Sequence, residues 1–131
     1  MEKEFIPYEQ ALALKELGFD EPCFMQWTYA PKLIFCIGNW GNTKFKTNKE
    51  SYSDSAGDCI SAPLYQQAFR WFREKYNFKS WVEEHTADTF IYEIRPHILT
   101  HYKEGEVYVY TIYEEAELAC LIKLIEIVKN K

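Results

Sequence analysis

Long apolar stretches are missing from this sequence of 131 residues. Runs such as 33–37 and 118–122 are far shorter than the ~20 residues that a membrane-spanning helix requires. The amino end also lacks the basic segment and apolar core of a secretory leader. We therefore expect no membrane-spanning segment and a cytoplasmic protein.

An excess of positive charge is missing as well. The chain holds 15 Lys and Arg against 20 Asp and Glu, which gives a formal net charge of -5. Because affinity for nucleic acids comes largely from neutralising phosphates, this balance disfavours general nucleic-acid binding.

Disulfides are not needed to stabilise the fold, since 47% of the residues are hydrophobic and can build a core. We predict free thiols at all four cysteines, which are Cys23, Cys36, Cys59 and Cys120.

Recognisable catalytic, cofactor and metal motifs are also absent from the sequence. His97 and His101 have the spacing of a zinc-binding helix, but the Glu of that motif is missing and Pro96 precedes them. Cys59 approaches a predicted helix from a polar loop, yet no family-type signature surrounds it. The segment 38–42 lacks the glycine spacing of a phosphate-binding loop. We expect no catalytic residue, metal site or cofactor.

Two segments in the first part of the chain have the periodicity of amphipathic helices. The segment 7–17 begins with a proline and is followed by Gly18 and Phe19, which suit a Schellman-type ending. The segment 63–76 places an apolar stripe opposite polar residues, and Asn77 suits its end.

A third helix is predicted to extend from the segment 111–114 to about residue 128. Thr111 and Glu114 fit a capping box, and acidic residues follow in the first turns. Its apolar residues cover more than one stripe, so we expect burial on several sides. Either its own fold covers the helix, or a second copy of the chain does.

Strand patterns lie between these helices. Segments rich in aromatic and β-branched residues occupy 23–29, 32–37, 78–83, 89–95 and 106–112. The strands do not alternate strictly with helices, and no repeat or linker divides the chain. We therefore predict one α+β domain over residues 1–131, with an antiparallel sheet of about four to six strands packed against three helices.

The segment 38–58 is polar and has little periodicity, so we predict an irregular loop. Aromatic side chains interleaved with lysines can stack on bases and contact phosphates, or can dock on a protein. We place a partner-binding site here, with a protein favoured over nucleic acid as the partner. The candidate residues are Trp40, Lys44, Phe45, Lys46 and Lys49.

Three blocks of the chain have a distinctive wording: FIPYEQALALKELGFDEPC at 5–23, ISAPLYQQAFRWFR at 60–73 and YEEAELAC at 113–120. They resemble a group of small uncharacterised proteins encoded in bacteriophage and related bacterial sequences. The resemblance implies a shared helical scaffold and a cytoplasmic accessory protein that acts on a host or phage component. It implies no activity, and it assigns no functional residue.

These observations favour a non-enzymatic accessory or interaction protein with an unidentified protein partner. Self-association as a homodimer is predicted through helix 113–128, because of its many apolar residues. An alternative is a small-molecule-binding or enzymatic domain with a pocket lined by aromatic residues, which make up 18% of the chain. A third hypothesis is nucleic-acid contact through the 38–58 loop.

Overall fold

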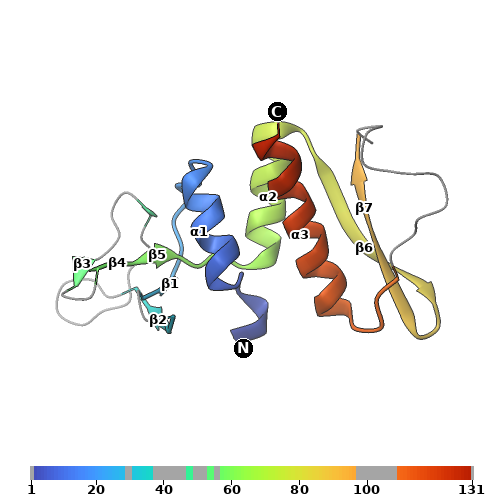
Figure 1. The fold of residues 1–131 in the computed structure, drawn as a ribbon, viewed down its shortest axis with the longest axis horizontal. Coiled ribbons are helices and arrows are strands. Elements are labelled where there is room, and N and C mark those ends of the chain that lie inside the picture. Colours follow the sequence, from blue (N-terminus) through green and yellow to red (C-terminus); the bar gives the residue numbers. More distant parts are fainter. Residues whose placement is uncertain are drawn as a thin grey trace. The chain divides into compact units, whose positions relative to one another are not determined.

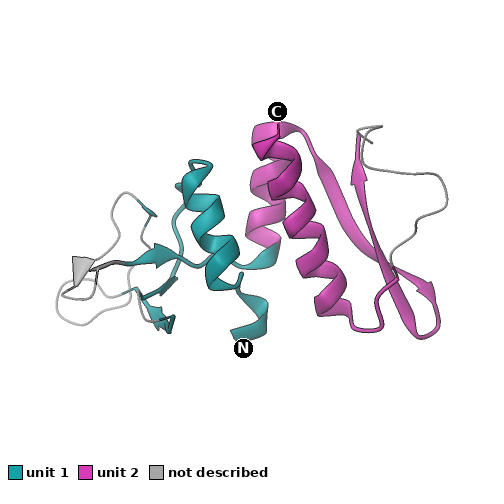
Figure 2. Ribbon diagram, in the orientation of Figure 1, with its two compact units in different colours: residues 1–65 teal, residues 66–131 magenta. Residues whose placement is uncertain are grey.

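The computed structural model describes residues 2–28, 31–36, 47–48, 53–54, 57–96 and 109–130. The chain divides into two compact units, residues 1–65 and 66–131 (Figure 2). Each unit is described by itself, so the single domain stays a prediction. None of the helices in the described part of the chain has the length and hydrophobicity to span a bilayer.

The main helix of the first unit, α1 (Tyr8–Glu16), confirms the prediction for this part of the chain (Figure 1). Pro7 occupies its N-cap position. At the other end, Gly18 has φ 95°, a left-handed conformation that glycine adopts without steric cost. The backbone N–H of Phe19 donates to the Leu14 carbonyl at 2.9 Å, which completes a Schellman-type ending.

The first unit begins with a 3-10 helix, η1 (Glu2–Glu4), and its described residues also form short antiparallel strands. The strands are β1 (Met25–Trp27), β2 (Leu33–Phe35), β3 (Ser53–Asp54), β4 (Gly57–Asp58) and β5 (Ile60–Ser61). One sheet has the order β2-β1-β5, and β3 pairs with β4 in a second. The hairpin predicted over 23–29 and 32–37 is thus present, with shorter strands.

Buried hydrogen bonds tie the pieces of the first unit together. The indole Nε1 of Trp27 donates to the Ile6 carbonyl at 2.8 Å. The buried side chain of Asn48 donates from Nδ2 to the Phe19 carbonyl at 2.8 Å. Its Oδ1 accepts from the backbone N–H of Ser61 at 2.9 Å. Asn48 therefore joins the end of the first helix to β5 through two hydrogen bonds.

The second unit contains most of α2 (Tyr65–Tyr76), the hairpin of β6 (Lys79–Thr86) and β7 (Thr89–Arg95), and α3 (Tyr113–Lys129). Figure 1 shows the hairpin in yellow and orange beside the red α3 helix. α3 packs against both strands of the hairpin. α2 ends where the sequence predicts, because Asn77 has φ 59° and stops the helix.

The capping box predicted at Thr111 and Glu114 is wrong. The N-cap of α3 is Ile112, which has extended φ and ψ angles of -122° and 129° and makes no side-chain cap hydrogen bond. A capping box requires the hydroxyl residue at the N-cap itself. Thr111 lies one residue too early, so its hydroxyl does not cap this helix.

The described residues establish an α+β chain in which all strand pairs are antiparallel. Their strands form sheets of three, two and two members, so one sheet of four to six strands is not confirmed. Residues 106–108 of the predicted strand 106–112 lie outside the described residues, and residues 109–112 form no strand. Within its described part, Tyr110 forms an antiparallel bridge with Phe90 of β7.

Candidate binding surface

The partner-binding residues predicted from the sequence lie outside the described residues. They are Trp40, Lys44, Phe45, Lys46 and Lys49. His97 and His101 also lie outside them, so these hypotheses stay predictions. In the part of the chain that the structure describes, no group of three or more His, Cys, Asp or Glu is placed to hold a metal ion.

All four cysteines are free and buried. The thiol of Cys36 donates to the Cys23 carbonyl at 3.2 Å, so it takes part in the packing of the first unit. Cys59 is 0% exposed, although the sequence places it beside a polar loop. Because a reactive cysteine needs both access and a lowered pKa, this burial favours a structural role for Cys59.

Polar side chains meet between α3 and the hairpin of the second unit. Cys120 is fully buried on α3, and burial is the main cause that raises the pKa of its thiol to about 12. The Ser80 side chain on β6 lowers this pKa by a smaller amount, and the charge of Glu117 raises it. Since the thiolate is the nucleophilic form, Cys120 is not a nucleophile at neutral pH.

Two further polar groups of this layer are buried. Glu117 is only 8% exposed, and burial raises the pKa of its carboxyl, with a further contribution from the charge of Glu114. Ser80 Oγ is buried and has no hydrogen-bond partner within the described residues. It lies close enough to the Cys120 thiol to affect its ionisation, but without the geometry of a hydrogen bond. The layer therefore has unused hydrogen-bonding capacity.

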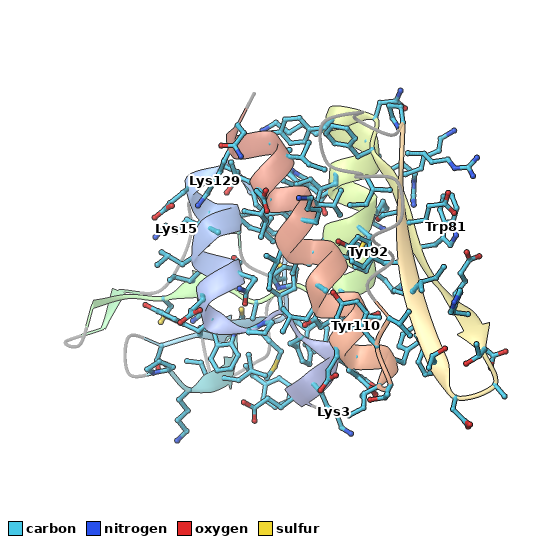
Figure 3. All side chains as sticks on the ribbon, turned by 45° about the vertical axis from the view of Figure 1, so that its right-hand side comes forward. Lys3, Lys15, Trp81, Tyr92, Tyr110 and Lys129 are labelled. Atoms are coloured by element: carbon cyan, nitrogen blue, oxygen red, sulfur yellow. The ribbon has the colours of Figure 1, made fainter. Side chains whose placement is uncertain are left out.

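Tyrosine side chains occupy the same layer. The rings of Tyr92 and Tyr110 lie 6.3 Å apart, and Figure 3 shows both residues between the hairpin and α3. Figure 3 also shows Trp81 on the opposite side of the hairpin. The pKa of Tyr113 is raised, first by burial and then by the charges of Glu117 and other groups on α3.

Large apolar side chains are exposed where the chain enters α3. Val109 is 46% exposed, Ile112 49% and Tyr113 40%. The Tyr113 ring contacts Phe90 of β7 edge to face, with 5.6 Å between the ring centroids. We call Val109, Ile112, Tyr113 and Phe90 the α3 entry surface. It combines exposed apolar area with an aromatic side chain that is held in place by a neighbour.

The remainder of α3 is largely covered. Its buried large apolar residues are Leu121, Leu124, Ile125, Ile127 and Val128. Ile122 is 44% exposed and is the large apolar residue that the helix presents to solvent beyond Tyr113. Self-association through helix 113–128 stays a prediction, with Ile122 as its exposed apolar residue.

The sequence analysis did not identify the α3 entry surface. The sequence predicted only that Val109 and Ile112 belong to a strand over 106–112. The observation that could have identified it is the run of apolar and aromatic residues on both faces of that strand directly before a helix. Comparison with protein-family models, with curated proteins and with solved structures finds no match to this chain.

Proposed function

We propose that this chain is a non-enzymatic accessory protein that binds another protein through the α3 entry surface. The exposure of three large apolar side chains, Val109, Ile112 and Tyr113, carries the proposal. Contiguous exposed apolar patches are a common mark of interaction sites on soluble proteins. Ordered aromatic side chains such as Tyr113 are also typical anchors of an interface, because they bury a large area at a small entropic cost.

Charge beside the surface narrows the class of partner. Glu114 and Glu115 are exposed in the first turn of α3, directly after Tyr113. An interface with an apolar centre and an acidic rim is complemented by an apolar pocket bordered by Lys or Arg. The resemblance of three blocks to phage-encoded proteins supports a host or phage protein in the cytoplasm as that partner.

Site-specific photocrosslinking tests this function. A benzophenone amino acid would replace Ile112 in one protein and Glu126, an exposed residue later on the same helix, in a matched control. Crosslinking in cells that express the chain should give a defined protein adduct from position 112 and none from position 126. The adduct should disappear when Tyr113→Ser is added. Equal labelling from both positions, or no adduct from position 112, would contradict the proposal.

The buried polar layer favours a second candidate function, the binding of a small polar molecule between α3 and the hairpin. The supporting observation is Ser80 Oγ, which is buried without a hydrogen-bond partner among the described residues, since buried polar groups are normally hydrogen-bonded. The carboxyl of Glu117 is buried in the same layer. A thermal-shift screen with nucleotides, sugars and amino acids tests it, because a ligand that binds the folded state raises the melting temperature. A hit should be lost in Ser80→Ala and kept in a control such as Thr89→Ala. A screen without hits leaves protein binding as the better explanation.

A further inference from the structure

Within the described part of the second unit, one edge of the hairpin is unpaired. Phe90 and Tyr110 exchange two backbone hydrogen bonds, so the backbone groups of Phe90 point away from β6. Along an antiparallel strand, the backbone N–H and C=O groups of successive residues point alternately to one neighbouring strand and to the opposite side. The residues of β6 that bond to β7 are therefore Trp81 and Glu83, whereas the backbone groups of Ser80 point to the outer edge of β6.

The outer edge of β6 has donors and acceptors to offer. The backbone N–H and C=O groups of Ser80, Val82 and Glu84 point to this side. Among the described residues, no strand lies beyond β6, and these groups have no hydrogen-bond partner there. An open strand edge is a template on which another strand can pair.

Side chains next to this edge form a pattern on the face of the hairpin away from α3. Trp81 lies on this face, with Lys79 two residues before it and Glu83 two residues after it. The guanidinium of Arg95 lies over the Trp81 ring, 5.4 Å from its centroid, and is itself paired to Glu93 at 2.9 Å. Arg95 thus holds the Trp81 ring against the sheet. Along β6, the positive charge of Lys79 lies on one side of the ring and the negative charge of Glu83 on the other.

We propose that β6 is a self-association edge, at which two copies of this chain pair antiparallel with Trp81 facing Trp81 of the second copy. In this register Ser80 lies opposite Val82 of the second copy, and their outward backbone groups exchange hydrogen bonds. Lys79 lies opposite Glu83 of the second copy, and Glu83 opposite its Lys79. These charged residues occupy non-hydrogen-bonded pairs, in which side chains approach most closely.

Charge selects this register over its neighbours. A shift that centres the pairing on Val82 places Lys79 opposite His85, so the ion pairs are lost. A further shift that centres it on Glu83 brings two like charges together. Charged residues on an edge strand usually oppose indiscriminate pairing. Of the three registers, only the one centred on Trp81 places each charge opposite its complement, which makes a second copy the best occupant of the edge.

Charge reversal with sedimentation velocity tests the proposal. The wild-type chain should sediment as a dimer at high micromolar concentration and dissociate on dilution. Lys79→Glu and Glu83→Lys should each weaken the dimer at least tenfold, because each places like charges in both pairs. The double variant K79E/E83K should regain the wild-type affinity. An equimolar mixture of the two single variants should also form a dimer, because the opposite charges meet again.

Matched controls are charge reversals outside the strand, Lys129→Glu and Glu126→Lys, both at exposed positions of α3. These should leave the dimer affinity unchanged. Trp81→Thr keeps a good strand residue at the twofold position and should also weaken the dimer, with circular dichroism showing that the fold is retained. A wild-type chain that stays monomeric, a dimer that survives both single reversals, or a double variant that fails to recover would each overturn the proposal. The outcome is independent of the proposed function, because the α3 entry surface contains none of the altered residues.

Discussion

Phe90 and Tyr110 exchange two backbone hydrogen bonds, of 2.7 Å and 2.9 Å. This pair covers the outer side of β7 at Phe90 and, through the regular register from Lys79 to Glu84, sets the direction of the backbone groups in that part of β6. Among the described residues, the open side of the hairpin is consequently β6. The same pair places Val109 and Ile112 next to the start of α3, so both proposed surfaces depend on where this pairing holds the chain.

Asn48→Ala should destabilise the first unit. The substitution leaves the Phe19 carbonyl and the Ser61 N–H without their buried partner. An unpaired buried group costs roughly 1–3 kcal/mol, so we expect a loss of about 3 kcal/mol in the free energy of unfolding. Urea denaturation measures it. Asn130→Ala, at an exposed residue, is the matched control and should change the free energy by less than about 0.5 kcal/mol.

Substitutions at the ends of α1 and α2 should change stability in opposite directions, because both positions have a positive φ angle. Gly18 has φ 95°, so Gly18→Ala should cost about 1–2 kcal/mol, the penalty for a Cβ in this conformation. Asn77 has φ 59°, and Asn77→Gly should be neutral or stabilising, because glycine reaches this region freely. Thermal unfolding of both variants measures the difference. A stable Gly18→Ala protein would show that the helix does not need this ending.

Glu117 predicts a pH dependence of stability. Burial raises the pKa of its carboxyl above the ordinary value of 4.5, and the Glu114 charge adds to the effect. The folded state then holds this proton more tightly than the unfolded state does. The contribution of Glu117 to stability therefore falls as the pH rises from the unfolded pKa through the raised folded pKa.

Glu117→Gln should remove this loss and make the protein more stable at neutral pH, by on the order of 1 kcal/mol, with little difference near pH 4. Chemical denaturation across this pH range measures the effect. Glu115→Gln, an exposed carboxyl on the same helix, should show no such trend. A Glu117→Gln variant that is less stable at neutral pH would indicate that the carboxylate has a stabilising partner.

The cysteines should resist modification in the folded protein. All four are buried, and the pKa of Cys120 is raised to about 12, mainly by burial. Alkylation with iodoacetamide, followed by mass spectrometry of each cysteine peptide, should proceed only at the rate of opening of the fold. Rapid labelling of any one cysteine in native protein would contradict its inert, structural role.

Local features of the chain could be predicted from the sequence. The end of the first helix follows from Gly18 and Phe19, and the end of the second from Asn77, because these positions are decided by backbone conformation within one turn. The cap of α3 was predicted wrongly because Thr111 is a preferred N-cap residue by type and Ile112 is not, although Ile112 has the extended dihedral angles of the N-cap.

Relationships between distant residues could not be predicted in the same way. Ser80 meets Cys120 across the layer between sheet and helix, and Phe90 meets Tyr110 across a strand pair. Sequence periodicity assigns a residue to one face of an element, but it does not say which element lies opposite. The open edge of β6 and the α3 entry surface both depend on such contacts, and therefore neither was predicted.

Residue-resolved hydrogen exchange by NMR, at low and at high protein concentration, tests the open edge of β6 most directly. In dilute protein, the amides of Ser80 and Val82 should exchange fast, while those of Trp81 and Glu83 are protected by β7. At high concentration the amides of Ser80 and Val82 should become protected as the second copy pairs with them. Protection of Ser80 and Val82 already in dilute protein, or fast exchange at both concentrations, would contradict the account.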